Sequence, residues 1–163
     1  MFKRVENNIN LADMENEISN YWDEIDAFQT SLNNRNNDKV FRFYDGPPFP
    51  TGSPHYGNLL AGVIKDIVPR YWTMRGYYVE RRFGWDVHGL PIEMEVQKNL
   101  NLEDPQQIDE YGIDKFNEAC RTQVQTNTEN WEKITRKIGR WVDFENDYKT
   151  MDIEFMESVW WVF

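Results

Sequence analysis

Residues 45–58 read Asp45-Gly-Pro-Pro-Phe-Pro-Thr-Gly-Ser-Pro-His-Tyr-Gly-Asn58, and this stretch decides the fold. Its prolines remove backbone donors and its glycines allow tight turns, so it cannot form a regular helix or strand. The preceding segment, residues 40–44, alternates and is rich in aromatic side chains, which is typical of a strand. A broad apolar helical pattern follows over residues 55–75. The order is therefore strand, Gly/Pro-rich turn and helix.

A second strand is predicted over residues 77–83, just after this helix. Within the helix, Pro69 predicts a kink or a local break, and Gly76 is typical of a helix end. A strand–helix–strand unit of this length implies a parallel sheet. We therefore expect an α/β fold of the Rossmann-like type.

Helical periodicity indicates further helices on both sides of this unit. Asn10 is a plausible N-cap for the first of them, which we expect to pack on the outside of the domain. Residues 101–112 are polar and are predicted to be a loop, and Gly139 to end a long helix. The predicted helices span residues 10–32, 91–100, 113–138, and a last segment starting at Thr150 or Asp152.

Composition excludes several classes of protein. The chain has 163 residues and a net charge of −10, which fits one globular domain and argues against a nucleic-acid clamp. Locally, residues 65–82 are basic, either as a solvated face or as a surface that faces phosphates. No apolar run is long enough for a membrane span, and residues 1–10 lack the apolar segment of a secretory signal. The lone Cys120, expected as a small buried residue, fits a cytoplasmic protein.

The two histidines of the chain, His55 and His88, both lie in segments of unusual composition. Backbone N–H groups at a helix start attract phosphate, so His55 and the helix that it opens are predicted to hold the phosphates of a nucleotide. Asp86 follows the second strand, where ligands of open α/β sheets bind. Its carboxylate could either hold an ammonium group or cap a turn.

Residues 45–58 resemble the ATP-binding signature of class I aminoacyl-tRNA synthetases. Three further segments, residues 64–71, 84–93 and 139–150, are similar to the isoleucyl-tRNA synthetase family in particular. The resemblance covers nearly the whole chain and is weakest at residues 1–10 and 99–112. It implies the first part of a Rossmann-like parallel-sheet nucleotide-binding domain, with an N-terminal helix and additional C-terminal helices.

The resemblance also assigns site residues. The family's His-x-Gly-His signature stabilises the ATP phosphates, which implies catalytic roles for His55 and Asn58. Asn58 departs from the family's usual histidine, and it keeps a hydrogen-bond donor but cannot become cationic. The implied ATP-binding residues are Pro48, Phe49, Gly52, His55, Gly57 and Asn58. The implied amino-acid-binding residues are Gly46, Pro47, Asp86 and His88.

The implied reaction joins L-isoleucine to ATP, with Mg²⁺, as isoleucyl-adenylate and then transfers the amino acid to tRNA(Ile). The family's Lys-Met-Ser-Lys-Ser signature does not occur here. We therefore expect residues 1–38 to be an N-terminal helical extension and residues 39–163 the first part of the catalytic domain, truncated before the editing insertion. Such a chain is expected to be inactive alone.

The resemblance extends to cofactors and partners. It implies tRNA contacts mostly through missing domains and a monomeric full-length enzyme. The residues themselves, with one cysteine and two well-separated histidines, predict no zinc site in this segment, and no membrane partner is expected for a protein of cytoplasmic location. Two alternatives stay open: a nucleotidylyltransferase that shares the His-x-Gly-His site, and a non-catalytic binding module derived from a synthetase.

Overall fold

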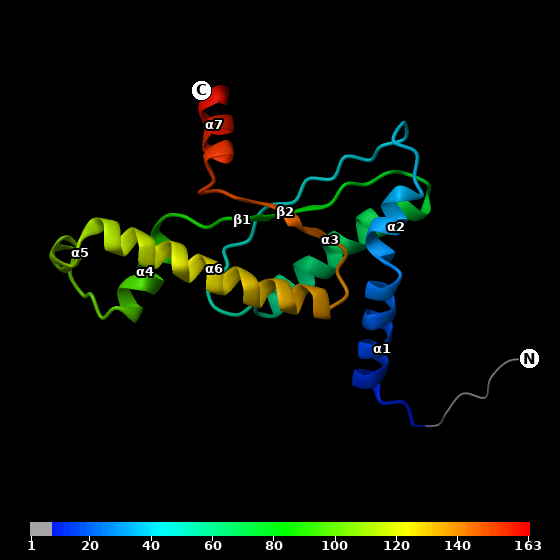
Figure 1. The fold of residues 1–163 in the computed structure, drawn as a ribbon, viewed down its shortest axis with the longest axis horizontal. Helices are drawn as coiled ribbons and strands as arrows, with labels where there is room; N and C mark the ends of the chain where they lie inside the picture. Colours follow the sequence, from blue (N-terminus) through cyan, green and yellow to red (C-terminus); the bar gives the residue numbers. More distant parts are fainter. Residues whose placement is uncertain (1–7) are drawn as a thin grey trace, which may run out of the picture.

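The computed structural model describes residues 8–163 (Figure 1). Residues 1–7, where the sequence predicts no secretory signal, lie outside the described residues. Within the described range no helix is both long and apolar enough to cross a membrane. The elements are α1 (Leu11–Glu24), α2 (Ala27–Asn33), α3 (Tyr56–Met74), β1 (Arg82–Trp85), α4 (Leu90–Asn99), α5 (Pro105–Tyr111), α6 (Ile113–Lys137), β2 (Asp143–Lys149) and α7 (Ile153–Val162).

The centre of the molecule is a parallel pair of strands, β1 and β2, which confirms the predicted α/β class. Arg82 pairs with Asp143 and Trp85 with Lys149, with an irregularity after Arg82. Residues 41–44, predicted as a strand, form none, because only Val40 makes a bridge, parallel to Tyr78, before the prolines begin. This bridge still places the start of the first segment beside the second, as a βαβ unit requires.

Two strand predictions need correction. The strand predicted over residues 77–83 begins only at Arg82, because Tyr78 is engaged in the isolated bridge. Strand β2 was not predicted at all, since its sequence is mostly charged and polar and lacks β-branched residues. It is nevertheless held in place by Phe144, which is buried in the core and stacks on Phe83.

The helix predictions are largely confirmed, with three corrections. The helix predicted over residues 10–32 is split into α1 and α2 at Asp26, whose φ of +45° breaks the helical path. The loop predicted over residues 101–112 contains α5, which Asp104 and Gln107 close with a capping box. Helix α3 continues through Pro69 without the local break that the proline suggested.

Helix ends follow the expected residues. Asn10 caps α1 by accepting the Ala12 N–H at 3.1 Å. Gly76 and Gly139 follow α3 and α6 with φ values of +87° and +76°, a conformation that glycine adopts without strain. These residues set where the long helices stop and where the chain turns back toward the sheet.

The core lies between the two strands and helices α4 and α6. Trp85 and Trp131 meet edge to face with ring centroids 6.4 Å apart, and Cys120 packs against this group while only partly buried. The buried members are Phe83, Trp85, Val87, Ile92, Val124, Trp131, Val142 and Phe144. This cluster fixes the carboxyl end of β1 against α6, and that end carries the candidate site.

Helix α3 buries a different face from the one that its periodicity suggested. The small residue Gly62, together with Pro69 and Thr73, faces the interior. The apolar stripe of Leu60, Ile64, Ile67, Tyr71 and Met74 is 48–76% exposed. The residues that meet its buried side come from short connecting segments, since Ile138 lies over Gly62 and Arg81 bonds to Thr73, so most of the apolar stripe stays uncovered among the described residues.

Arg81 is the most unusual buried residue, because only 4% of it is exposed. Its Nη2 donates to Thr73 Oγ1 at 2.5 Å, whereas Nε and Nη1 have no hydrogen-bond partner among the described residues. Burial lowers the pKa of Arg81 to about 10; the nearby Asp66 carboxylate opposes this shift and the Arg70 guanidinium adds to it. A buried cation without a directly paired carboxylate destabilises a fold.

We therefore expect Arg81→Met to leave the free energy of unfolding unchanged or to raise it by about 1–3 kcal/mol, because methionine fills similar space without an uncompensated charge. Urea denaturation measures this difference. Arg75→Met, at an exposed position, is the matched control and should stay within about 0.5 kcal/mol. If Arg81→Met instead lowers the free energy of unfolding by more than about 2 kcal/mol, the buried arginine stabilises the fold, and the expectation is wrong.

Candidate functional site

His55 is the N-cap of α3, and its imidazole closes the start of the helix. Its Nδ1 accepts the backbone N–H groups of Gly57 at 3.1 Å and Asn58 at 3.4 Å. A nitrogen that accepts these bonds carries no proton, so the neutral ring holds its proton on Nε2. The exposed His55 therefore presents Nε2–H as a donor at the positive end of a helix of 19 residues.

Asn58 completes the same cap from the other direction. Its Oδ1 accepts the backbone N–H of His55 at 3.0 Å, which makes a reciprocal capping box with the imidazole. The side-chain carbonyl is thus used inside the protein. The remaining group is an NH₂ donor on a half-buried residue that lines a cavity beside the Gly/Pro-rich loop.

The loop of residues 45–55 is tied down at several points by neighbouring elements. Trp131 Nε1, on α6, donates to Gly52 O at 2.8 Å. The backbone N–H of Asp86 donates to Pro48 O at 2.9 Å, which joins the loop to the end of β1. Because the prolines cannot donate, these anchors come from outside the loop.

Asp45, at the start of the loop, holds two cations. Its Oδ1 lies 2.5 Å from Lys65 Nζ on α3, and its Oδ2 lies 2.5 Å from Arg140 Nη2 in the segment before β2. Lys65 Nζ also donates to Gly46 O at 3.1 Å. Asp45 and Arg140 are almost fully buried, so this ion cluster is protected from screening by solvent.

A cavity of about 280 Å³ lies between this loop, α3 and α6. Its walls combine apolar side chains with polar groups of Asn58, Lys65, Thr135 and Arg140. A small concave site with an apolar wall and a few converging polar groups is the usual form of a small-molecule site. The lining includes Gly46, Pro47, Pro48, Pro54, Asn58, Leu59, Gly62, Lys65, Phe83, Trp131, Thr135, Ile138 and Arg140.

The turn of residues 86–88 is organised by Thr150, a buried residue just after β2. The Thr150 hydroxyl accepts the Val87 N–H at 3.0 Å and lies 2.7 Å from His88 Nδ1 and 3.4 Å from Asp86 Oδ1. Its backbone N–H donates to Trp85 O at 2.9 Å. One residue therefore orients both polar side chains of the turn.

His88 also lines a second cavity of about 260 Å³, between α4 and α6. Cys120 and Glu93 face the same space. Burial raises the pKa of the Cys120 thiol, and the Glu93 carboxylate raises it further. The thiol therefore stays protonated and unreactive at neutral pH.

Gly84, next to the predicted site residues, has a steric role. A Cβ at this position would lie 2.2 Å from the ring of Tyr148, which covers the glycine from β2. Burial raises the pKa of Tyr148; the carboxylates of Asp45 and Asp86 add to this shift and Arg82 opposes it.

Five of the predicted site residues lie around one cavity in the structure. Gly46, Pro47, Pro48 and Asn58 line one cavity, and His55 caps the helix that forms its wall.

The other predicted residues lie around this group. Gly57 donates to the His55 imidazole, and Asp86 bonds to Pro48 through its backbone. Phe49 and Gly52 lie exposed on the loop and outside the cavity lining, and His88 faces the second cavity. Their roles in binding stay predictions.

Sequence reasoning missed four residues that hold the site together: Lys65, Trp131, Arg140 and Thr150. Lys65 and Arg140 lie in segments that carry the family resemblance but were given no role there, and Trp131 was one apolar position in a long helix. Nothing near Thr150 marked it as the anchor of a turn more than 60 residues earlier in the chain.

Comparison with known proteins places this arrangement in a family. The family model described as tRNA synthetases class I (I, L, M and V) matches residues 17–163. The chain belongs to the class I tRNA synthetases.

The relatives of this class I synthetase chain agree on one member of the class. The cytoplasmic isoleucine–tRNA ligase of Arabidopsis thaliana is 56% identical over 91% of the chain. The isoleucine–tRNA ligases of Chlamydia abortus and Treponema denticola are 57% and 51% identical over 94% and 99% of it. The chain spans only 12–15% of the length of these relatives.

A solved structure supports the fold of this class I synthetase chain. It is a ternary complex of the Agrobacterium radiobacter K84 leucyl-tRNA synthetase (LeuRS) with tRNA and LeuAMS. The TM-score is 0.62 at 18% identity, over 86% of this chain and 16% of the other. Similar backbones at so low an identity show that the Rossmann-like architecture of the class is present.

Gly84→Ala is expected to destabilise the chain by about 1–3 kcal/mol, because the added methyl overlaps the Tyr148 ring and forces it to move. Thermal unfolding measures the change. The Tyr148→Ala variant removes the ring, and with it the overlap. Adding Gly84→Ala to Tyr148→Ala should therefore lower the stability much less than adding Gly84→Ala to the parent chain. Full additivity of the two substitutions would show that the ring and the glycine do not interact.

Asn58→Ala should destabilise the chain by about 0.5–2 kcal/mol, because the His55 N–H loses its acceptor. Asn58→Asp keeps an acceptor oxygen and places negative charge at a helix start, so its unfolding free energy should match that of the parent chain or exceed it. Urea denaturation of both variants decides the point. Equal destabilisation in the two would contradict a capping role.

Proposed function

We propose that this chain supplies part of the ATP and isoleucine site of an isoleucine–tRNA ligase. The observation that carries the proposal is that α3, which His55 caps, also forms a wall of the cavity beside the Gly/Pro-rich loop. Identity of 51–57% with isoleucine–tRNA ligases selects isoleucine among the amino acids of the class.

The phosphates of ATP would lie at the start of α3. The helix N-terminus is positive, and His55 Nε2–H donates from the same end. Asn58 adds an NH₂ donor, and the residue at Gly57 has no side chain to block close approach. Pro48, Phe49 and Gly52 are proposed to flank the nucleotide from the loop.

The amino acid would lie between the loop and the end of β1. Gly46 and Pro47 are proposed to border the isoleucine side chain, with apolar cavity walls that include Phe83 and Ile138. Asp86 is proposed to hold the α-ammonium group, oriented by the Thr150 hydroxyl. His88, oriented by the same hydroxyl, is proposed to border this end of the site.

The reaction that fits these positions is attack by an isoleucine carboxylate oxygen on the α-phosphorus of ATP. The bond from that phosphorus to the β-phosphate bridging oxygen breaks, and pyrophosphate leaves. The residues of this chain act by orientation and by hydrogen bonds to developing charge, because no protein nucleophile is required. Mg²⁺ would arrive with ATP, since it commonly binds substrate phosphates.

Transfer of the isoleucyl group to tRNA(Ile) completes the proposed activity. Residues 39–163 are proposed as the first part of the catalytic domain and residues 1–38 as an N-terminal extension. The proposed location is the cytoplasm, and a monomer is the proposed state of the enzyme. The chain alone is not expected to charge tRNA.

The test is calorimetric titration of the chain with a non-hydrolysable isoleucyl-adenylate analogue. We expect binding at least about fivefold tighter than that of the valyl analogue, because one further methylene is buried. Asp86→Ala should weaken binding about tenfold or more, because a charged hydrogen bond to the ammonium is lost.

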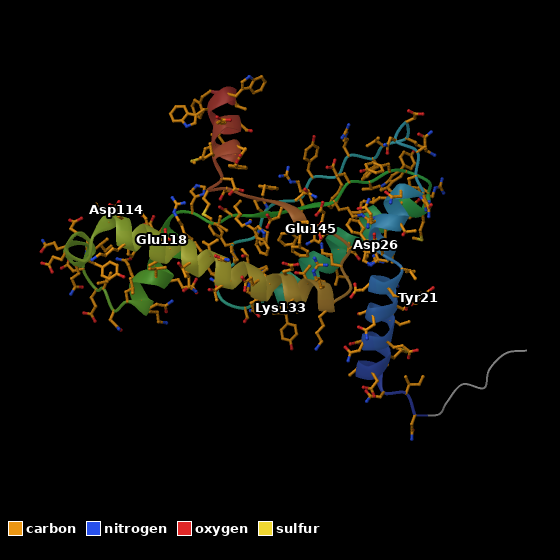
Figure 2. All side chains as sticks on the ribbon, viewed as in Figure 1. Tyr21, Asp26, Asp114, Glu118, Lys133 and Glu145 are labelled. Atoms are coloured by element: carbon orange, nitrogen blue, oxygen red, sulfur yellow. The ribbon has the colours of Figure 1, made fainter. Side chains whose placement is uncertain are left out.

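Asp114→Ala is the matched control, because it removes the same charge at the far end of α6, labelled in Figure 2, and should leave binding unchanged. Binding without an isoleucyl preference would contradict the proposed substrate. No binding at all would contradict a formed site within these residues.

A further inference from the structure

Helix α1 carries an exposed apolar stripe that the proposed function does not use. Four of its positions and its C-cap residue, spaced alternately by three and four residues, are 43–62% exposed, and no residue of α1 is buried. We call these residues the α1 seam: Leu11, Met14, Ile18, Tyr21 and Ile25. Spacing of this kind is the a/d pattern by which one helix packs along another.

Residues 8–163, the part of the chain that the structure describes, leave all five seam residues exposed. Trp22 is the side chain that attaches α1 to the domain, through an edge-to-face contact with Trp141 at 5.3 Å. Tyr21, labelled in Figure 2, lies on the side of α1 turned away from α3 and α6. Helix α1 thus projects from the body, as Figure 1 shows, with its seam facing solvent.

The acidic residues beside the α1 seam indicate the charge of the partner that could bind there. Asp13, Glu17 and Glu24 follow one edge, and Glu15 lies on the other. Helix α1 contains no lysine or arginine. Two copies of α1 would bring acidic edges together in either orientation, and an anionic lipid surface would be repelled in the same way.

We propose that the α1 seam docks a basic amphipathic helix of a partner polypeptide. This helix presents apolar residues at three- and four-residue spacing between rows of lysine or arginine. The apolar rows supply the buried area, and the cations pair with the acidic edges of α1 to set partner choice. This interaction is independent of the proposed ligase activity, because α1 contributes nothing to either cavity that holds predicted site residues.

The probe is a synthetic helix of about 20 residues with leucine at positions a and d and lysine at e and g, titrated into the full 163-residue chain. We expect one-to-one binding, with amide shifts in nuclear magnetic resonance spectra confined to α1 and its junction with α2. Raising salt from about 50 to about 500 mM should weaken binding about tenfold. A matched peptide with glutamate at e and g should not bind.

Two variants distinguish binding at the α1 seam from nonspecific binding to exposed apolar residues. Ile18→Ser should weaken binding of the lysine peptide about tenfold or more, because it removes the central seam residue. Ile67→Ser makes the same substitution at a more exposed isoleucine on α3, 59% against 43% for Ile18, and should have no effect. Four results would overturn the proposal: no binding, equal binding of both peptides, dimerisation of the chain that Ile18→Ser abolishes, or α1-dependent adsorption to phosphatidylserine vesicles.

Discussion

The carboxylate of Asp45 joins the three parts of the molecule that make the site. It lies at the start of the Gly/Pro-rich loop, five residues after Val40 bridges to Tyr78. Lys65 reaches it from α3 and Arg140 from the segment before β2. The cluster holds one negative and two positive charges, so removal of the Asp45 carboxylate would leave two cations close together without the anion that both contact. Asp45 therefore ties the loop both to α3 and to the segment before β2, and residues of all three line the cavity or border it.

Local signals predicted the helices well because they depend on neighbouring residues. Asn10 caps α1, Pro91 lies in the first turn of α4, and Gly139 follows α6, and each acts within a few residues of its own position. Even the missed helix α5 had such a signal, since Asp104 and Gln107 stand at the spacing of a capping box. The α/β class followed from the same reasoning, because strand, turn and helix alternate along residues 40–85.

Features that depend on distant partners could not be found in this way. Strand β2 has little intrinsic strand preference and exists because it pairs with β1 and places Phe144 against Phe83. Helix α3 shows the opposite case, a local signal without a partner. Its apolar periodicity indicates a face suited to burial, but it does not say which segment covers that face. In the site, the motifs were visible as short stretches, whereas the contacts of Thr150 with Val87 and His88 join residues more than 60 positions apart.

The capping box at the start of α3 limits which of its side chains can carry a positive charge. Protonation of His55 on Nδ1 would break its bonds to the N–H groups of Gly57 and Asn58, so the cap holds only while that nitrogen is neutral. Asn58 cannot supply a positive charge, and its carbonyl is already used in the cap. In the arrangement that the structure shows, this helix start offers a ligand the helix dipole and two donors, namely His55 Nε2–H and the Asn58 NH₂ group. Fixed donors of this kind act through their orientation, which the cap itself maintains.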